Sequence, residues 1–476
     1  MFRREPPKMN QPSQGAPEMG CGQPLPHLER RIGLLSAISI NMADMVGSGT
    51  FVTLPLMLAA IGGPQALIGW VVGAVIAFTD GLVWSELATS FPGSGGTYVY
   101  LRESLGRERW GRLWGFLFVF QMISSGPLEI ASGNIAIAQY GSYLWRGMTA
   151  VQVKLVAAGI GILGTALLYR RITSIVKVMF LLWIGMLISI AWVILTGASH
   201  FSPQLAFSFP PNAVAFRGGF ISGVGATTLF AMYCYLGYYG TCYLGDEVVN
   251  SARTIPRSVL LSAAVVALMD LAFCLSIVGV MPWQEVMRSK FMICEFMQRI
   301  YGHWAGAVVC LLMMWTSFGG IYAMLLTYSR IPYAAARDGN FFRIFSRLHG
   351  RKDFPHYSLL LIGGLATAAS FLDLDQVINA LIMARVPVQF VGQIVALLWL
   401  RSRHPEVKRP FRMMLYPVPC VVALCGWIFI FLAAPARYIA FGLLSMIAGC
   451  AVFLALARRN RTWPFVRQVQ PAPNTA

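Results

Sequence analysis

The chain has 476 residues, of which 57% are hydrophobic and only 12% are charged. Soluble domains carry roughly 25% charged residues, so this composition excludes a soluble globular protein and indicates an integral membrane protein. A strongly basic chain, here with a net charge of +18, can indicate a nucleic-acid-binding protein. In this sequence, however, the distribution of Lys and Arg among the loops indicates membrane topology and no nucleic-acid partner.

Apolar runs predict the membrane spans. A helix needs about 20 residues to cross ~30 Å of hydrocarbon, and we expect twelve such spans. They cover residues 33–59, 66–90, 112–141, 151–169, 172–197, 219–249, 258–281, 304–333, 357–372, 376–400, 414–434 and 437–457. The ninth is short. Residues 1–30, rich in Pro and Gln, are predicted to be a disordered tail.

Two of these spans are interrupted by glycine. The first breaks at Gly47-Ser48-Gly49 and the sixth at Gly237-Tyr238-Tyr239-Gly240. In a membrane, each orphaned backbone group costs several kcal/mol unless a cavity or a ligand replaces the lost hydrogen bond. Breaks at matching positions of two halves predict the substrate site of a secondary transporter near the bilayer midplane. The alternative, close packing of helices on small residues, favours every fourth position rather than consecutive ones.

Basic residues gather in alternate loops, after spans 2, 4, 6, 8 and 10, whereas the intervening loops are poor in Lys and Arg. The basic set is Arg102, Arg107, Arg109, Arg112, Arg170, Arg171, Arg253, Arg257, Arg337, Arg343, Arg347, Arg351, Lys352, Arg401, Arg403, Lys408, Arg409 and Arg412. These loops lie on the same side as both termini, so the positive-inside rule predicts that both termini are cytoplasmic.

Nothing in the sequence points to a metal, a cofactor or an enzyme. The nine cysteines are scattered, mostly inside spans, without metal-ligand spacing. The histidines lie in tails, loops or span ends, and no Ser/His/Asp constellation is present.

Several motifs in order give the chain a family resemblance. They are Gly47-Ser48-Gly49-Thr50-Phe51, Phe91-Pro92-Gly93-Ser94-Gly95-Gly96-Thr97-Tyr98, Asp246-Glu247-Val248-Val249-Asn250 with Arg253, Ile255 and Pro256, Ser329-Arg330 with Ala336-Arg337-Asp338-Gly339, and Arg401 with Pro405, Arg409-Pro410 and Phe411. The chain resembles the amino acid–polyamine–organocation permease superfamily, including its L-type amino acid transporter branch.

This resemblance implies an all-α leucine-transporter-like fold of about twelve helices. The transporter domain would occupy residues 31–459, with spans 1–5 and 6–10 as inverted repeats followed by spans 11 and 12, and residues 460–476 would form a cytoplasmic tail. Some L-type relatives need a heavy chain bound through a cysteine between spans 3 and 4. The loop from Gly141 to Ala150 has no cysteine, so we expect no disulfide-linked heavy chain.

The two breaks offer complementary backbone groups. Freed amides around Gly47, Ser48 and Gly49 can hold a carboxylate, because an unwound helix exposes N–H groups at the start of its second half. The family pattern places a gating aromatic at Tyr233 and the ammonium-accepting carbonyls on Tyr233, Cys234 and Leu236, next to Gly237. The family usually has glycine at Leu236, so a narrower pocket is expected. For Tyr233, the alternative is an aromatic ring that only fills the core.

Ionisable residues inside spans are functional candidates. Glu129 and Arg385 have matching depths, counted at ~1.5 Å per residue from the cytoplasmic ends of spans 3 and 10. Each heads a polar stripe, Gln121-Ser125-Glu129 and Arg385-Gln389-Gln393. We expect a salt bridge across an outer gate. The alternative is a purely structural salt bridge between two helices that do not move relative to each other.

Coupling candidates lie near the first break. Lys177 in span 5 resembles the lysine that replaces a sodium ion in proton-coupled relatives, and an ion pair with Asp44 is conceivable. Snorkelling of Lys177 to the surface is the alternative. Thr316 and Ser317 in span 8 are hydroxyl partners for the same region. Asp270 in span 7 has no assigned role.

The sequence therefore predicts a secondary active transporter of amino acids in the plasma or bacterial inner membrane, with proton coupling as one mode. A polyamine or basic amino acid carrier, suggested by Asp44, Glu129 and Asp270, is the alternative, as is an exchanger without ion coupling. The expected partners are a small-molecule substrate, an amino acid or amine, and the lipid bilayer.

Overall fold

A computed structural model describes residues 30, 32–47, 49–93, 95–107, 109–145, 147–169, 175–211, 213, 218–245, 247–349 and 354–459. The side chains of 175–183 and 218 are outside this description. Two positions of interest are affected: Ser48 lies outside the described residues, and only the backbone of Lys177 is described. The predicted tails, apart from Arg30, also lie outside them.

The described chain is helical, with one isolated β-bridge between Ile32 and Val248. The helices of the first half are α1 (Leu34–Met45), α2 (Gly49–Ile61), η1 (Pro64–Leu67), α3 (Ile68–Ser90), α4 (Thr97–Ser104), α5 (Trp110–Leu144), α6 (Ala150–Leu168), α7 (Ile175–Ser199) and α8 (Pro203–Ala206). Those of the second half are α9 (Gly218–Tyr235), η2 (Gly240–Tyr243), α10 (Ser251–Val278), α11 (Trp283–Arg288), α12 (Met292–Tyr301), α13 (His303–Arg337), η3 (Arg343–Ser346), α14 (His356–Ala369), α15 (Leu374–Arg385), the π-helical η4 (Val386–Val391), α16 (Gly392–Arg403), α17 (Val418–Ala433) and α18 (Ala436–Arg459).

Each predicted span overlaps one or more of these helices, but not all are long enough to cross a membrane alone. Within the described residues, seven helices have the length and hydropathy of a span, or eight if the bent pair α1 and α2 is one span. The ninth predicted span is the 14-residue α14, and α9 stops early at its break. The count of twelve spans therefore stays a prediction.

Both predicted breaks are confirmed. Helix α1 ends at Met45 and α2 begins at Gly49, with a bend of 46° between them. Helix α9 ends at Tyr235, and Gly237 has φ +109°, a left-handed conformation that glycine adopts without strain. A side chain at Gly237 would also collide with Asp44, because a Cβ built there falls 2.8 Å from its backbone carbon. Glycine at this position lets the two broken helices touch.

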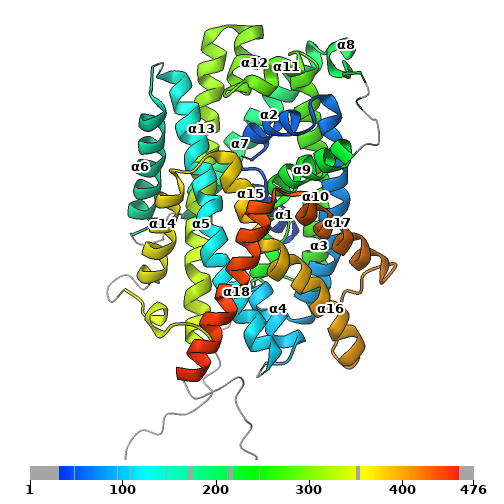
Figure 1. The fold of residues 1–476 in the computed structure, drawn as a ribbon, viewed down its shortest axis with the longest axis vertical. Coiled ribbons are helices and arrows are strands. Elements are labelled where there is room, and N and C mark those ends of the chain that lie inside the picture. Colours follow the sequence, from blue (N-terminus) through cyan, green and yellow to red (C-terminus); the bar gives the residue numbers. More distant parts are fainter. Residues whose placement is uncertain are drawn as a thin grey trace, which may run out of the picture.

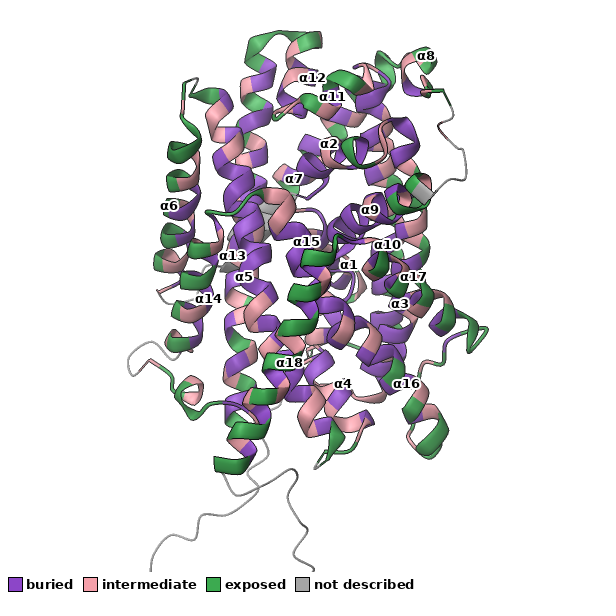
Figure 2. Cartoon of the chain, viewed as in Figure 1, coloured by how far each residue is buried: buried purple, intermediate pink, exposed green. Residues whose placement is uncertain are grey.

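The broken helices pack against longer ones: α1 contacts α10, and α9 contacts α3 (Figure 1). Helices α5 and α13 form a long packed pair, and α5 also packs against α6, α14 and α15. Figure 2 shows a largely buried α5, whereas α6 and α18 carry many exposed positions on the outside. This arrangement agrees with outer helices that face lipid and an α5 that contributes to the interior.

Helix α4 ties several elements together at one end of the molecule. Arg102 contacts Asp338, the residue after α13, at 2.5 Å, and the Tyr98 hydroxyl donates to the same carboxylate at 3.1 Å. Asn340 donates to the Tyr98 oxygen at 2.8 Å. Burial, followed by the Asp338 charge, raises the pKa of Tyr98 to about 12. Tyr98 is therefore a protonated donor at neutral pH.

Candidate functional site

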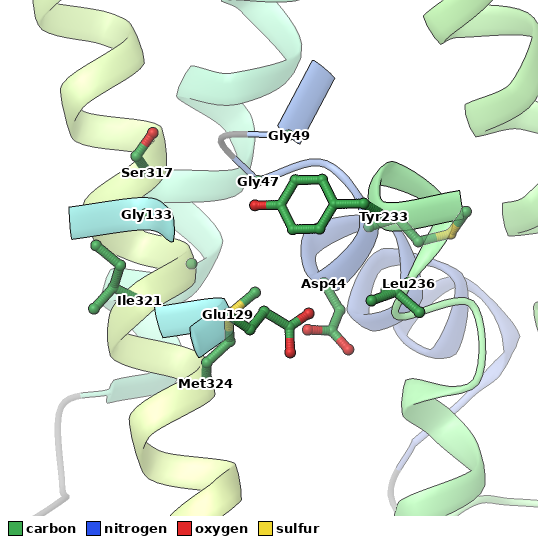
Figure 3. A pocket seen from close by; sticks show the side chains of 12 residues that line it. Asp44, Gly47, Gly49, Glu129, Gly133, Tyr233, Leu236, Ser317, Ile321 and Met324 are labelled. Carbon is green, nitrogen blue, oxygen red and sulfur yellow. The ribbon is translucent and has the colours of Figure 1, made fainter. Parts of the chain in front are cut away.

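A small cavity lies where the two broken helices meet α5 and α13 (Figure 3). Its lining residues are Asp44, Met45, Gly47, Gly49, Glu129, Gly133, Tyr233, Leu236, Ser317, Gly320, Ile321 and Met324. Seven of the predicted site residues are among them. The cavity measures about 20 Å³, room on the order of one water molecule. An amino acid would fit only after the lining moves apart.

The first break contributes backbone donors to this cavity. The amide of Val46 still donates to the Met42 carbonyl, which closes the last turn of α1. No described carbonyl accepts a hydrogen bond from the amide of Gly47 or Gly49. Because α2 starts at Gly49, its first amides carry the positive end of a helix dipole. This end of the cavity is suited to an anionic group.

The second break contributes acceptors. Beyond the end of α9, Leu236 donates to the Met232 carbonyl and Tyr238 to the Tyr235 carbonyl. Within the described residues, no backbone amide donates to the carbonyls of Cys234 and Leu236. These two groups have acceptor capacity for a ligand ammonium. The Cys234 side chain points elsewhere: it is buried and 3.3 Å from the Thr53 hydroxyl on α2.

Tyr233 forms one wall of the cavity beside the first break. Its hydroxyl lies 2.7 Å from the Ser132 hydroxyl on α5. A Cβ built on Gly49 would fall 3.1 Å from the Tyr233 ring, so the ring rests against the start of α2. The glycine at position 49 thus permits the close approach of α2 and α9.

Glu129 and Arg385 are in contact. The Arg385 Nη2 atom is 2.5 Å from Glu129 Oε2, and their side chains are 1% and 6% exposed. Arg385 Nε also donates to the Ser125 hydroxyl at 3.2 Å, and Tyr328 on α13 donates to Glu129 Oε2 at 2.5 Å. The cluster joins α5, α13 and the end of α15. Arg385 itself lies behind Glu129 and is not a lining residue.

Only the first of the two predicted polar stripes has a hydrogen bond between its own side chains. Gln121 donates to Ser125 at 2.6 Å within α5. On the other side, the π-helical η4 begins directly after Arg385 and contains Pro387. Its wider turn changes the phase of the helix, so Gln393 accepts a hydrogen bond from Thr97 of α4 instead.

Asp44 faces Glu129 across the cavity (Figure 3). Its carboxylate has no hydrogen bond or ion pair within the described part of the chain. The suggested Asp44–Lys177 pair involves a side chain outside the described residues. The Ser317 hydroxyl is buried and has no described hydrogen-bond partner.

Asp270, unassigned from the sequence, lies behind the first break. It is 1% exposed, and the Thr50 hydroxyl on α2 donates to its Oδ1 at 3.0 Å. Its second oxygen is buried without a described partner. Asp270 is not a lining residue of the cavity. It supports the start of α2 from the side of α10.

Comparison with known proteins agrees with this architecture. Residues 32–459 match the family model described as amino acid permease. The chain is 26% identical to the human cystine/glutamate transporter, over 88% of this chain and 82% of that protein. It is also 26% identical to the human large neutral amino acids transporter small subunit 2, over 93% and 81% of the two chains. An uncharacterized transporter of Mycobacterium tuberculosis is 29% identical over 72% and 73%.

Proposed function

Because this chain belongs to the amino acid permease family, we propose that it is a secondary active transporter that carries amino acids across the cell membrane by alternating access. Its relatives bear names that refer to cystine, glutamate and large neutral amino acids. The observation that carries the proposal is the cavity at the two helix breaks, with unused amides on one side and unused carbonyls on the other. A polyamine substrate has no support among these relatives.

In this proposal the substrate carboxylate binds the amides of Gly47, Ser48 and Gly49. The ammonium binds carbonyls of Tyr233, Cys234 and Leu236, beside the turn at Gly237. An α-amino acid is the simplest ligand that satisfies both ends. The Leu236 side chain lines the cavity and narrows the space left for the substrate side chain. Tyr233 must shift to admit the substrate, which gives it the role of a gating aromatic.

Glu129 and Arg385 serve as a gate in the same scheme. Their ion pair links α5 to the end of α15, next to the π-helical η4. Such π-turns occur often at functional sites, and this one places an adjustable segment directly after the gating arginine. Breaking the pair would free α15 to move relative to α5 and open a path to the cavity.

In one version of the proposal, transport is coupled to protons through Lys177, with Ser317 as a hydroxyl partner and Asp44 as a counter-ion. Exchange of one amino acid for another without ion coupling is the second version. The protein would span the membrane with a 5+5 inverted repeat and with both termini in the cytoplasm, as the placement of its Lys and Arg residues indicates.

The experiment is uptake of labelled neutral, basic and acidic amino acids and putrescine into proteoliposomes. One arm imposes an inward proton gradient, and another preloads unlabelled amino acid. Stimulation by the gradient, lost in Lys177→Ala, supports proton coupling. Uptake only against preloaded amino acid supports exchange. Transport of putrescine with no amino acid transport would refute the proposed carboxylate site.

A further inference from the structure

The charge of the cavity points to a class of substrate. Glu129 and Arg385 neutralise each other at 2.5 Å. Asp44 adds a second carboxylate to the lining, and no side chain within the described residues forms an ion pair or hydrogen bond with it. With its acidic groups ionised, the described lining therefore carries one uncompensated negative charge. A charge enclosed in a small cavity without a partner is costly, and a ligand that supplies the partner binds more tightly for that reason.

The position of Asp44 is fixed by contacts with both broken helices. It lies in the last turn of α1, three residues before Gly47. Its side chain packs against the turn after α9: a Cβ built on Gly237 would fall 2.8 Å from the Asp44 Cβ, and one on Gly240 would fall 3.4 Å from its Oδ2. Asp44 is thus held beside the cavity and is only partly exposed.

Asp44 is not one of the groups that would hold the amino acid backbone. The amides of Gly47 and Gly49 and the carbonyls of Cys234 and Leu236 already offer partners for the α-carboxylate and the α-ammonium. Asp44 is then available for a third group, at the end of the substrate side chain. Leu236, Ile321 and Met324 also line the cavity, and their apolar surface suits the aliphatic stem of a long cationic side chain.

We propose that Asp44 binds the cationic side-chain end of a basic amino acid and thereby sets the substrate preference of this transporter. The proposal rests on the proposed function, because it assumes that an amino acid occupies the cavity, and it assigns Asp44 to the substrate in place of a role as counter-ion of Lys177. A guanidinium can bind one carboxylate through two parallel hydrogen bonds, and an ammonium binds it as a point charge. Arginine is therefore the expected best substrate, followed by lysine.

The test measures uptake of labelled arginine, lysine, leucine and glutamate by the wild type, Asp44→Asn and a control, Asp375→Asn, in the first turn of α15. The wild type is expected to prefer arginine. Asp44→Asn is expected to lower arginine kcat/KM by about tenfold or more, the usual value of a hydrogen bond to a charged group. Leucine uptake is expected to change less than about threefold, and the control is expected to match the wild type.

Three outcomes would overturn the inference. A wild type that prefers leucine or glutamate to arginine would refute it without recourse to any variant. Equal loss of all substrates in Asp44→Asn would place Asp44 at the α-ammonium or in the scaffold. The same loss pattern in Lys177→Met and Asp44→Asn would identify Asp44 as the counter-ion of Lys177. Failure of the wild type to transport any amino acid would instead refute the proposed function itself.

Discussion

The buried Glu129–Arg385 pair gives the sharpest energetic prediction. Both side chains are at most 6% exposed, and the two charges touch at 2.5 Å. Removing one partner of a buried pair strands the other charge, which typically costs about 3–5 kcal/mol, whereas replacing both with apolar residues is often neutral. We therefore expect Arg385→Met or Glu129→Leu alone to lower the free energy of unfolding by about 3–5 kcal/mol.

The double variant is expected to lose much less than either single one. In it, the remaining penalty is the Tyr328 hydroxyl, which loses its acceptor on Glu129 at a cost of about 1–3 kcal/mol. Unfolding in mixed micelles with increasing denaturing detergent, followed by tryptophan fluorescence, measures these values. Losses that add within about 0.5 kcal/mol would refute the reasoning, because they would mean that the two charges do not depend on each other.

The same variants distinguish a gating role of the Glu129–Arg385 ion pair from a purely structural one. If the pair opens and closes during transport, the double variant folds but transports with an altered rate and a leak. If the pair only joins two fixed helices, the double variant recovers both stability and transport. Uptake and efflux in proteoliposomes, normalised to folded protein, decide between these roles.

Three further predictions concern single side chains. Gly49→Ala places a methyl group 3.1 Å from the Tyr233 ring and should weaken substrate binding by about 1–3 kcal/mol, measured as a raised KM. The control is Gly159→Ala, where an added Cβ would meet no atom within 4 Å, and it should leave uptake unchanged. Tyr328→Phe removes the donor to Glu129 and should lower the free energy of unfolding by about 1.5–3 kcal/mol, and an unchanged value would contradict the cluster. The pKa of Tyr98 is raised to about 12 in the folded protein, against ~10 in an unfolded chain. Protonated Tyr98 therefore stabilises the fold below pH ~10, and this stabilisation is lost as the pH rises to about 12. Tyr98→Phe should accordingly show a shallower fall in melting temperature between these two pH values than the wild type.

The sequence was most informative about the broken helices and the ion pair. Two glycines separated by one residue, at 47 and 49, and the glycine at 237 have few explanations inside an apolar span, and each lies where the helix is interrupted. Glu129 and Arg385 could be paired because helical rise converts sequence position into depth. Two opposite charges at the same depth in a membrane are expected to pair, because an unpaired charge there is costly.

Other features of the site had no sequence signal. Tyr328 is one aromatic among many in apolar spans, and its role depends on α13 packing against α5. The π-helical η4 contains Pro387, and a fixed spacing of four residues cannot anticipate the phase change that it causes. The contact between Asp44 and Gly237 joins distant parts of the chain, so it too required the tertiary structure.

The most direct test of the central claim asks whether the site binds both the α-carboxylate and the α-ammonium of an amino acid. The measurement is inhibition of labelled arginine and leucine uptake by each amino acid and by its decarboxylated amine, agmatine for arginine and isoamylamine for leucine. If the amides at the first break bind the carboxylate, the amino acids compete and the amines, at equal concentration, do not. Equal competition by the amines would show that no carboxylate is recognised there and would contradict the account.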